Sequence, residues 1–345
     1  METPKNYIKK QYYLIFLVHG NNGDSKDMFP FKRAISKKFN VNNPKLLKII
    51  CSSCNEKNTH VGVKIGGLNL AREIINSVMK LMPQNDDEIF FSIIAHSLGG
   101  LFSRSCLSTV FENPICKKHL IPKSFISLNC PHLGVRRTFN SWNPAKIIYN
   151  SVVHGVCNYL YNKTGSDLLL NNDVLLNLSK DENLCKFENV TLVGLNNDII
   201  VPFTTSLISL NVPENKVSLI DGLNLVRSTG FNEEYIHLKL GDKFLSNNCE
   251  CVSNITPKKI NNKVPEIVSD NLNQIEFSYE MFNNLQNQKI NWRRIYLACG
   301  INYSPVAHDM TIKKGDKLFG IVFDIDGCNQ FINLITEILM IDNKN

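Results

Sequence analysis

The sequence lacks any long hydrophobic run. No stretch approaches the roughly 18 apolar residues that a membrane-spanning helix needs, and residues 1–11 are polar, without the apolar core of a signal peptide. These two absences predict a cytoplasmic protein without a transmembrane segment. Peripheral association with a membrane is compatible with this prediction.

The chain also lacks a basic stripe. Its formal net charge is +7, from 38 basic and 31 acidic residues, but the basic residues are scattered along the chain. A nucleic-acid-binding surface would gather them in a stripe with interleaved aromatic residues. We therefore expect no nucleic-acid partner, and we interpret the excess charge as favouring solubility.

Cysteine spacing shows no regular pattern. There are eleven cysteines, an odd number, and without a secretion signal they are predicted to be free thiols. The pairs Cys51/Cys54 and Cys249/Cys251 offer four zinc ligands between them, but neither pair lies in a zinc-ribbon context. We therefore expect no metal and no organic cofactor.

Apolar, β-branched runs alternate with segments of helical periodicity. This alternation predicts a mostly parallel central sheet with helices on both faces. No internal repeat is visible, and we expect a single domain over residues 1–345. The predicted strands cover residues 12–18, 45–51, 88–95, 123–128, 190–195 and 291–298, and the predicted helices cover residues 28–39, 66–81, 98–110 and 328–341.

Two segments interrupt this alternation. Residues 136–186 have helical character with clustered aromatic and apolar side chains. They are predicted either to form a lid over a site or to add a helical layer to the core. Residues 245–290 are polar, rich in asparagine and poorly patterned, which predicts a mobile loop or a disordered insertion.

The most specific motif spans residues 93–100, Ile-Ile-Ala-His-Ser-Leu-Gly-Gly. It follows a predicted strand, precedes a predicted helix and is similar to the nucleophile elbow G-x-S-x-G. Ser97 would be the nucleophile on a tight turn, whose neighbours two places away must be small. Gly99 meets this need, and Ala95 replaces the usual first glycine. The alternative is a buried serine in an ordinary strand-to-helix turn.

A second motif, His19-Gly20, ends the first predicted strand. In proteins with a nucleophile elbow, the loop after this strand gives one backbone N–H to an oxyanion hole, and the residue after the nucleophile gives the other. The candidates are Asn21 (or Asn22) and Leu98. His19 comes too early in the chain to be the general base, and we expect it to orient its loop or to be a plain turn residue.

The remaining partners should follow in the order acid, then histidine. Asp198 comes directly after the predicted strand 190–195, where an orienting carboxylate belongs. The alternative is that Asp198 only caps a turn and that the acid is one of three other aspartates. These are Asp167, Asp173 and Asp221.

The candidate general base is His308, which lies one loop after the last predicted strand. The other late histidine, His237, lies in an alternating strand-like stretch, and we interpret it as structural.

Together these motifs resemble, in the same order, the lipase-like serine esterases of eukaryotes within the α/β-hydrolase superfamily. This family includes a yeast lipid-droplet phospholipase and many plant and protist proteins. The resemblance covers roughly residues 12–205 and 290–345, and its departures are Ala95 and Cys130. The matching segments are residues 18–20, 66–74, 95–101, 129–134, 197–202 and 307–309.

The resemblance implies an α/β-hydrolase fold with a helical lid-like insertion, and lipase or esterase activity on acyl lipids. It also implies a lipid or small ester substrate, with peripheral contact to a membrane or lipid droplet as a further option. The residues themselves indicate acyl transfer to water by Ser97, His308 and Asp198. A thioesterase or acyltransferase with the same three residues, and an inactive hydrolase-fold binding protein, are the alternatives.

Overall fold

The computed structural model describes most of the predicted core. Within the described part of the chain, no helix combines the length and the apolarity that crossing a bilayer requires. The described residues are 9–39, 46–84, 86–135, 155, 159, 161–195, 198, 200–209, 216–218, 221, 224, 227–228, 235–240, 272–299, 305–313 and 325–343.

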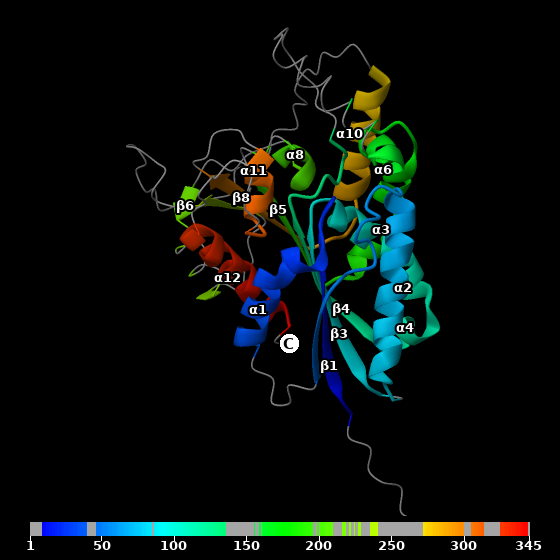
Figure 1. Cartoon of the computed structure of the whole chain (residues 1–345), viewed down its shortest axis with the longest axis vertical. Coiled ribbons are helices and arrows are strands. Elements are labelled where there is room, and N and C mark those ends of the chain that lie inside the picture. The colour runs from blue at the N-terminus through cyan, green and yellow to red at the C-terminus, as the bar shows by residue number, and fades with distance from the viewer. Residues whose placement is uncertain are drawn as a thin grey trace, which may run out of the picture.

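One sheet of eight strands forms the centre of the molecule (Figure 1). Its order is β2-β1-β3-β4-β5-β8-β7-β6, and all described neighbours pair in parallel. The α/β fold with a mostly parallel sheet is therefore confirmed. The strands are β1 (Gln11–Val18), β2 (Leu47–Cys51), β3 (Glu88–His96), β4 (Leu120–Leu128), β5 (Asn189–Leu195), β6 (Lys216–Ser218), β7 (Tyr235–Leu240) and β8 (Trp292–Cys299).

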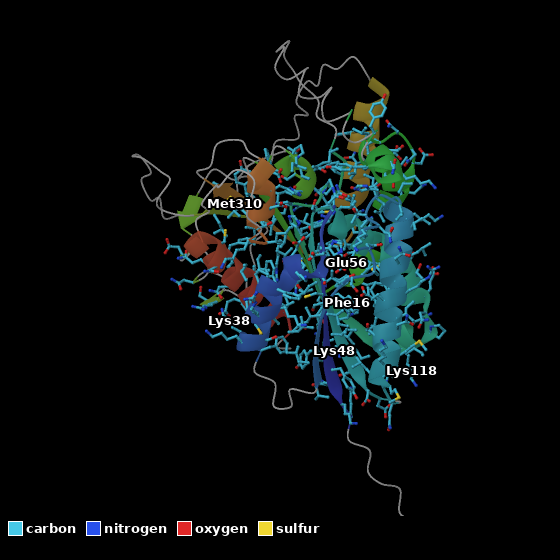
Figure 2. The ribbon with its side chains drawn as sticks, in the orientation of Figure 1. Phe16, Lys38, Lys48, Glu56, Lys118 and Met310 are labelled. Atoms are coloured by element: carbon cyan, nitrogen blue, oxygen red, sulfur yellow. The ribbon has the colours of Figure 1, made fainter. Side chains whose placement is uncertain are left out.

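Helices cover both faces of this sheet, as Figure 1 shows with α2 and α3 on one side and α1 and α12 on the other. Side chains of β1 alternate between the two layers, because successive residues of a strand point to opposite faces. Leu14 and Phe16 join the cluster that contains Leu70 of α2, whereas Ile15 joins the cluster that contains Phe331 of α12. Figure 2 places Phe16 near the middle of the molecule.

The helices have the following bounds. The α-helices are α1 (Phe29–Lys38), α2 (Val63–Leu81), α3 (Leu98–Glu112), α4 (Pro114–His119), α6 (Asn162–Leu168), α7 (Val174–Lys180), α8 (Phe203–Ser206), α10 (Leu272–Gln286), α11 (Pro305–Met310) and α12 (Ile325–Asp342). Two 3₁₀ turns are η1 (Ser25–Met28) and η3 (Asn183–Lys186).

Helix α2 begins three residues before the predicted start. Its first N–H, on Val63, donates to Asp167 Oδ2 at 2.7 Å, and the N–H of Gly62 donates to Thr164 Oγ1 at 2.9 Å. Both acceptors belong to α6, about a hundred residues later in the chain. A cap that comes from so far away extends the helix beyond what its local sequence indicates.

The first predicted insertion follows one of its two predicted alternatives in its described part. Residues 162–186 form α6, α7 and η3, with Leu168, Leu175 and Leu184 buried in the main core. This part is a packed helical layer, whereas most of residues 136–160 lie outside the described residues.

The prediction of a mobile or disordered loop over residues 245–290 is wrong for its C-terminal part. Residues 272–286 form α10, which contacts α7 and buries Met281 and Leu285 completely. These two side chains, four residues apart, lie on one face of the helix, and Phe282 packs against the same cluster. Residues 245–271 lie outside the described residues.

Candidate active site

Ser97 occupies a strained turn between β3 and α3. Its backbone angles are φ 52° and ψ −128°, a region that costs a non-glycine residue about 1–3 kcal/mol. Two hydrogen bonds fix the turn: the Ser97 N–H donates to Leu128 O at 2.8 Å, and the Gly100 N–H donates to Ser97 O at 3.0 Å. The sheet therefore imposes the geometry that the nucleophile-elbow motif predicts for Ser97.

Small residues let this turn contact the end of β1. A Cβ atom added at Gly99 would lie 2.4 Å from His19 O and 2.8 Å from Val18 O, and one added at Gly20 would lie 2.8 Å from Ser97 Cβ. The serine turn and the end of β1 thus lie too close together for a larger residue at either glycine. The two glycines explain why the first and second motifs of the sequence meet in the fold.

Ser97, His308 and Asp198 form a continuous hydrogen-bonded chain. His308 Nε2 lies 2.7 Å from Ser97 Oγ, and His308 Nδ1 lies 2.6 Å from Asp198 Oδ2. All three residues are buried, with relative exposures of 7%, 5% and 3% for Ser97, His308 and Asp198. They follow β3, β8 and β5, and the carboxyl ends of parallel strands lie at one edge of the sheet.

The second carboxylate oxygen of Asp198 is held by backbone. Asp198 Oδ1 accepts the N–H groups of Ile200 at 2.8 Å and Val201 at 2.9 Å. Because one oxygen is fixed in this way, the other is aimed at His308 Nδ1. This arrangement selects the tautomer in which His308 Nδ1 carries the proton and Nε2 faces the serine hydroxyl.

Charges around His308 favour its protonated form. Burial alone lowers the pKa of His308, but the charge of Asp198, its hydrogen bond and the nearby charge of Asp309 outweigh this effect. The pKa of His308 is therefore raised above the ordinary histidine value. A group with this environment accepts a proton from a serine hydroxyl more readily than an isolated imidazole does.

The other candidate acids lie elsewhere. Asp167 caps α2 and also accepts a hydrogen bond from Asn172 Nδ2 at 2.8 Å, while Asp173 and Asp221 are exposed. His237 belongs to β7, where it pairs in register with Lys216 and Tyr296, and its side chain lies outside the described residues.

The two backbone N–H groups predicted for an oxyanion hole, those of Asn21 and Leu98, have no backbone acceptor within the described part of the chain. The N–H of Asn22 differs, because it donates to Thr59 Oγ1 at 3.1 Å. Leu98 is the first residue of α3, where free N–H groups and the helix dipole favour negative charge.

Two residues that the sequence analysis treated only as parts of motifs contact His308. His96 Nε2 lies 3.1 Å from His308 O, and Asn129 Nδ2 donates to the same oxygen at 2.9 Å. Both are buried. Their position directly before the nucleophile and directly after β4 is the only sequence signal that could have singled them out.

Metal ligands are poorly arranged in the described residues. Cys51 and Cys54 are free thiols, and burial raises the pKa of Cys54 to about 12. Cys249 and Cys251 lie outside the described residues. His96, His308 and Asp309 place potential ligand atoms within 4.8 Å of one another, but the ring nitrogens of His308 already contact Asp198 and Ser97.

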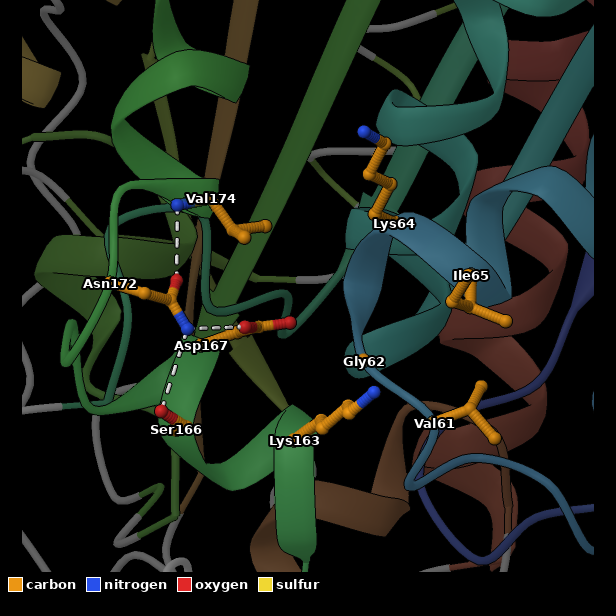
Figure 3. Close-up of a pocket in the computed structure, with 9 residues that line it drawn as sticks. All are labelled: Val61, Gly62, Lys64, Ile65, Lys163, Ser166, Asp167, Asn172 and Val174. Carbon is orange, nitrogen blue, oxygen red and sulfur yellow. Dashed lines mark hydrogen bonds between the residues drawn. The ribbon is translucent and has the colours of Figure 1, made fainter.

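A pocket of about 330 Å³ opens between α2 and the α6–α7 segment (Figure 3). Asn172 is one of the residues that line it: Asn172 Nδ2 donates to Asp167 Oδ1, and Asn172 Oδ1 accepts the N–H of Val174 at 3.0 Å. Ser97, Asp198 and His308 are not among the lining residues. These are Val61, Gly62, Lys64, Ile65, Lys163, Ser166, Asp167, Asn172 and Val174.

The parallel sheet, the strained serine turn and the buried Ser-His-Asp chain at its edge define an α/β-hydrolase fold. Residues 8–210 match the sequence model of the family described as "Putative serine esterase (DUF676)". This match covers more than half of the chain, which therefore belongs to that family. No curated protein matches the chain at a significant level.

Several solved structures are similar to this chain at low identity. Carboxyl esterase 2 from the mycorrhizal fungus Tuber melanosporum is 12% identical, with a TM-score of 0.41 over 94% of this chain and 76% of that one. Phospholipase PlaB from Legionella pneumophila is 15% identical, with a TM-score of 0.35 over 52% of this chain. The chain spans 38% of the length of PlaB.

A third structure is the peroxisomal alpha-beta-hydrolase Lpx1 from Saccharomyces cerevisiae. It is 12% identical to this chain, with a TM-score of 0.32 over 58% of this chain and 67% of that one. Likeness at this level says nothing of substrate.

Proposed function

We propose that this protein is a serine hydrolase that cleaves carboxylic ester bonds through Ser97, His308 and Asp198. The observation that supports this most strongly is the pair of short contacts of His308, 2.7 Å to Ser97 Oγ and 2.6 Å to Asp198 Oδ2, in a buried setting. Membership of a serine esterase family supports the same reaction class.

The first half of the reaction forms an acyl-enzyme. Ser97 Oγ attacks the ester carbonyl carbon while His308 Nε2 takes the hydroxyl proton, and Asp198 stabilises the resulting imidazolium. The carbonyl oxygen becomes an oxyanion that receives the N–H groups of Asn21 and Leu98. When the tetrahedral intermediate collapses, the C–O bond to the alcohol breaks and His308 gives its proton to the departing alkoxide.

The second half returns the enzyme to its starting state. A water molecule takes the place of the alcohol and gives a proton to His308 Nε2 as its oxygen attacks the acyl carbon. Collapse of this second tetrahedral intermediate breaks the bond to Ser97 Oγ, which recovers the proton from His308. The products are a carboxylic acid and an alcohol, and the residues regain their initial protonation.

Acyl lipids are the substrate class that we propose, as a lipase or phospholipase. This part rests on the resemblance of the sequence motifs to lipase-like esterases. A buried nucleophile agrees with an apolar acyl group, because water around Ser97 must be displaced before attack. The substrate would then be presented at the surface of a membrane or lipid droplet.

The test compares hydrolysis of short and long p-nitrophenyl esters with release of fatty acid from phospholipid vesicles. A lipase should hydrolyse long-chain esters and vesicles faster than short soluble esters, and the Ser97→Ala variant should lose all of these activities. Preference for short esters would limit the proposal to a general esterase. Activity that survives in Ser97→Ala would refute the serine mechanism.

A further inference from the structure

The main-chain carbonyl of His308 is held by two buried side chains from strand ends distant in sequence, and the local side chain of Thr311 adds a longer hydrogen bond from Oγ1 at 3.5 Å. His308 O lies 3.1 Å from His96 Nε2 and accepts a hydrogen bond from Asn129 Nδ2 at 2.9 Å. His96 and Asn129 have relative exposures of 2% and 0%. We call these two donors the carbonyl clamp.

Both members of the clamp are fixed by the sheet. His96 is the last residue of β3 and pairs in register with Leu128 of β4. Asn129 follows Leu128 with φ 51°, and its N–H donates to Val193 O on β5 at 2.9 Å. The clamp therefore ties His308 to the strands that also position Ser97 and Asp198.

Within the described residues, the Asn129 side chain forms hydrogen bonds only with the turn at residues 308–311. Its Nδ2 donates to His308 O and to Thr311 Oγ1 at 3.2 Å, while its buried Oδ1 has no partner within the described residues. A buried amide oxygen without a partner is costly. Asn129 thus keeps an orientation that satisfies the turn at residues 308–311 rather than its own oxygen.

The reaction creates a need for such a clamp. In the resting state the His308 ring is held at both nitrogens, by Ser97 and by Asp198. In the acyl-enzyme Ser97 Oγ carries the acyl group and no longer has a proton to share with Nε2. Asp198 is then the only hydrogen-bond partner of the ring among the described residues, beside the packing of the His96 ring at 4.9 Å between centroids. The position of Nε2 towards the incoming water therefore depends on where the backbone of His308 lies.

We propose that His96 and Asn129 are positioning residues that keep His308 aligned through both halves of the reaction by holding its backbone carbonyl. This inference rests on the proposed function. Because misplacement of a reacting group by about 1 Å can cost up to about 100-fold in rate, loss of the clamp should lower kcat more than it raises KM.

The experiment measures kcat, KM and the pH profile of kcat/KM on a short soluble ester. The variants are His96→Phe and Asn129→Ala, which remove one donor each, and His96→Gln, which keeps an N–H donor. The downfield proton NMR signal of the His308 Nδ1–H facing Asp198 is recorded for each variant. We expect His96→Phe and Asn129→Ala to lower kcat by up to about 100-fold, with a shifted or broadened NMR signal, and His96→Gln to recover most of the rate.

The matched control is His119→Phe. His119 is also a buried histidine that contacts a backbone carbonyl, with Nδ1 2.8 Å from Asp87 O, at the opposite end of the sheet. This variant should lose stability while it keeps the wild-type kcat, pH profile and NMR signal. Should His96→Phe fail to fold, Asn129→Ala and His96→Gln carry the same comparison.

Two results would overturn the proposal. The first is a folded His96→Phe or Asn129→Ala variant with wild-type kcat, pH profile and NMR signal. The second is a His119→Phe variant that loses as much kcat as the clamp variants, which would mark the effect as general loss of packing. Failure of the proposed function is distinct, because the wild type would then be inactive or Ser97→Ala would stay active.

Discussion

Replacement of Gly99 by alanine should separate the serine turn from the end of β1. The added Cβ atom would lie 2.4 Å from His19 O and 2.8 Å from Val18 O, and both are backbone atoms that cannot rotate away. The first turn of α3 must therefore move, together with Ser97 and the N–H of Leu98. We expect a folded protein that has lost most of its reactivity at Ser97.

The magnitude follows from the cost of overpacking. Inserting one methyl group into a tightly packed site costs about 1–3 kcal/mol. For chains of about 150–250 residues, 1 kcal/mol lowers Tm by about 2–4 °C, and by less in larger chains. We therefore expect Gly99→Ala to lower Tm by only several degrees. The rate constant for inactivation by a fluorophosphonate should fall to a small fraction of the wild-type value.

The assay combines thermal unfolding with the inactivation rate, and Gly155→Ala is the matched control. A Cβ atom at Gly155 meets no other atom within 4 Å, so this variant should keep the wild-type reactivity. A Gly99→Ala protein with wild-type Tm and wild-type inactivation rate would refute the packing argument. So would a Gly155→Ala protein with equal losses.

Further predictions concern charge. Because the pKa of His308 is raised and only its neutral form accepts a proton, kcat/KM should fall as pH drops through that pKa. The charge of Asp309 contributes to this raised pKa, so Asp309→Asn should move the acidic limb of the pH–rate profile to lower pH. Asp167→Ala should lower the free energy of unfolding by about 0.5–2 kcal/mol through loss of the α2 cap, measured by urea unfolding, with kcat unchanged. Asp342→Ala should cost about 3–5 kcal/mol in the same assay, because Asp342 Oδ1 lies 2.6 Å from Arg293 Nη1 in a buried pair.

The sheet was predictable because parallel strands covered on both faces are continuous apolar runs. The segment 88–95 is of this kind, and in β3 all residues after Glu88 are buried. Strand β6 was not predicted, since three residues are too few to show a pattern. Helix α10 was missed because the few apolar side chains that attach it to the core, Met281, Phe282 and Leu285, lie next to a long polar segment.

The site was predictable where chain order restricts the choice. Ser97 stands in a local motif, and the order acid then histidine leaves few candidates for the other two positions. Ser97 and His308 are 211 residues apart, so their contact was inferred from the order of strands and not from any local pattern. The contact of His96 and Asn129 with His308 was not predicted, because a side chain that binds the backbone of a distant turn leaves no residue pattern at that turn.

The most direct test of the central claim is covalent labelling by a fluorophosphonate probe, followed by peptide mapping. We predict one labelled residue, Ser97, in the wild type. Labelling should vanish in Ser97→Ala, nearly vanish in His308→Ala and weaken in Asp198→Ala, with each variant shown to be folded. A folded wild type that takes up no probe, with or without phospholipid vesicles, or that takes it up at another residue, would contradict the proposed serine hydrolase.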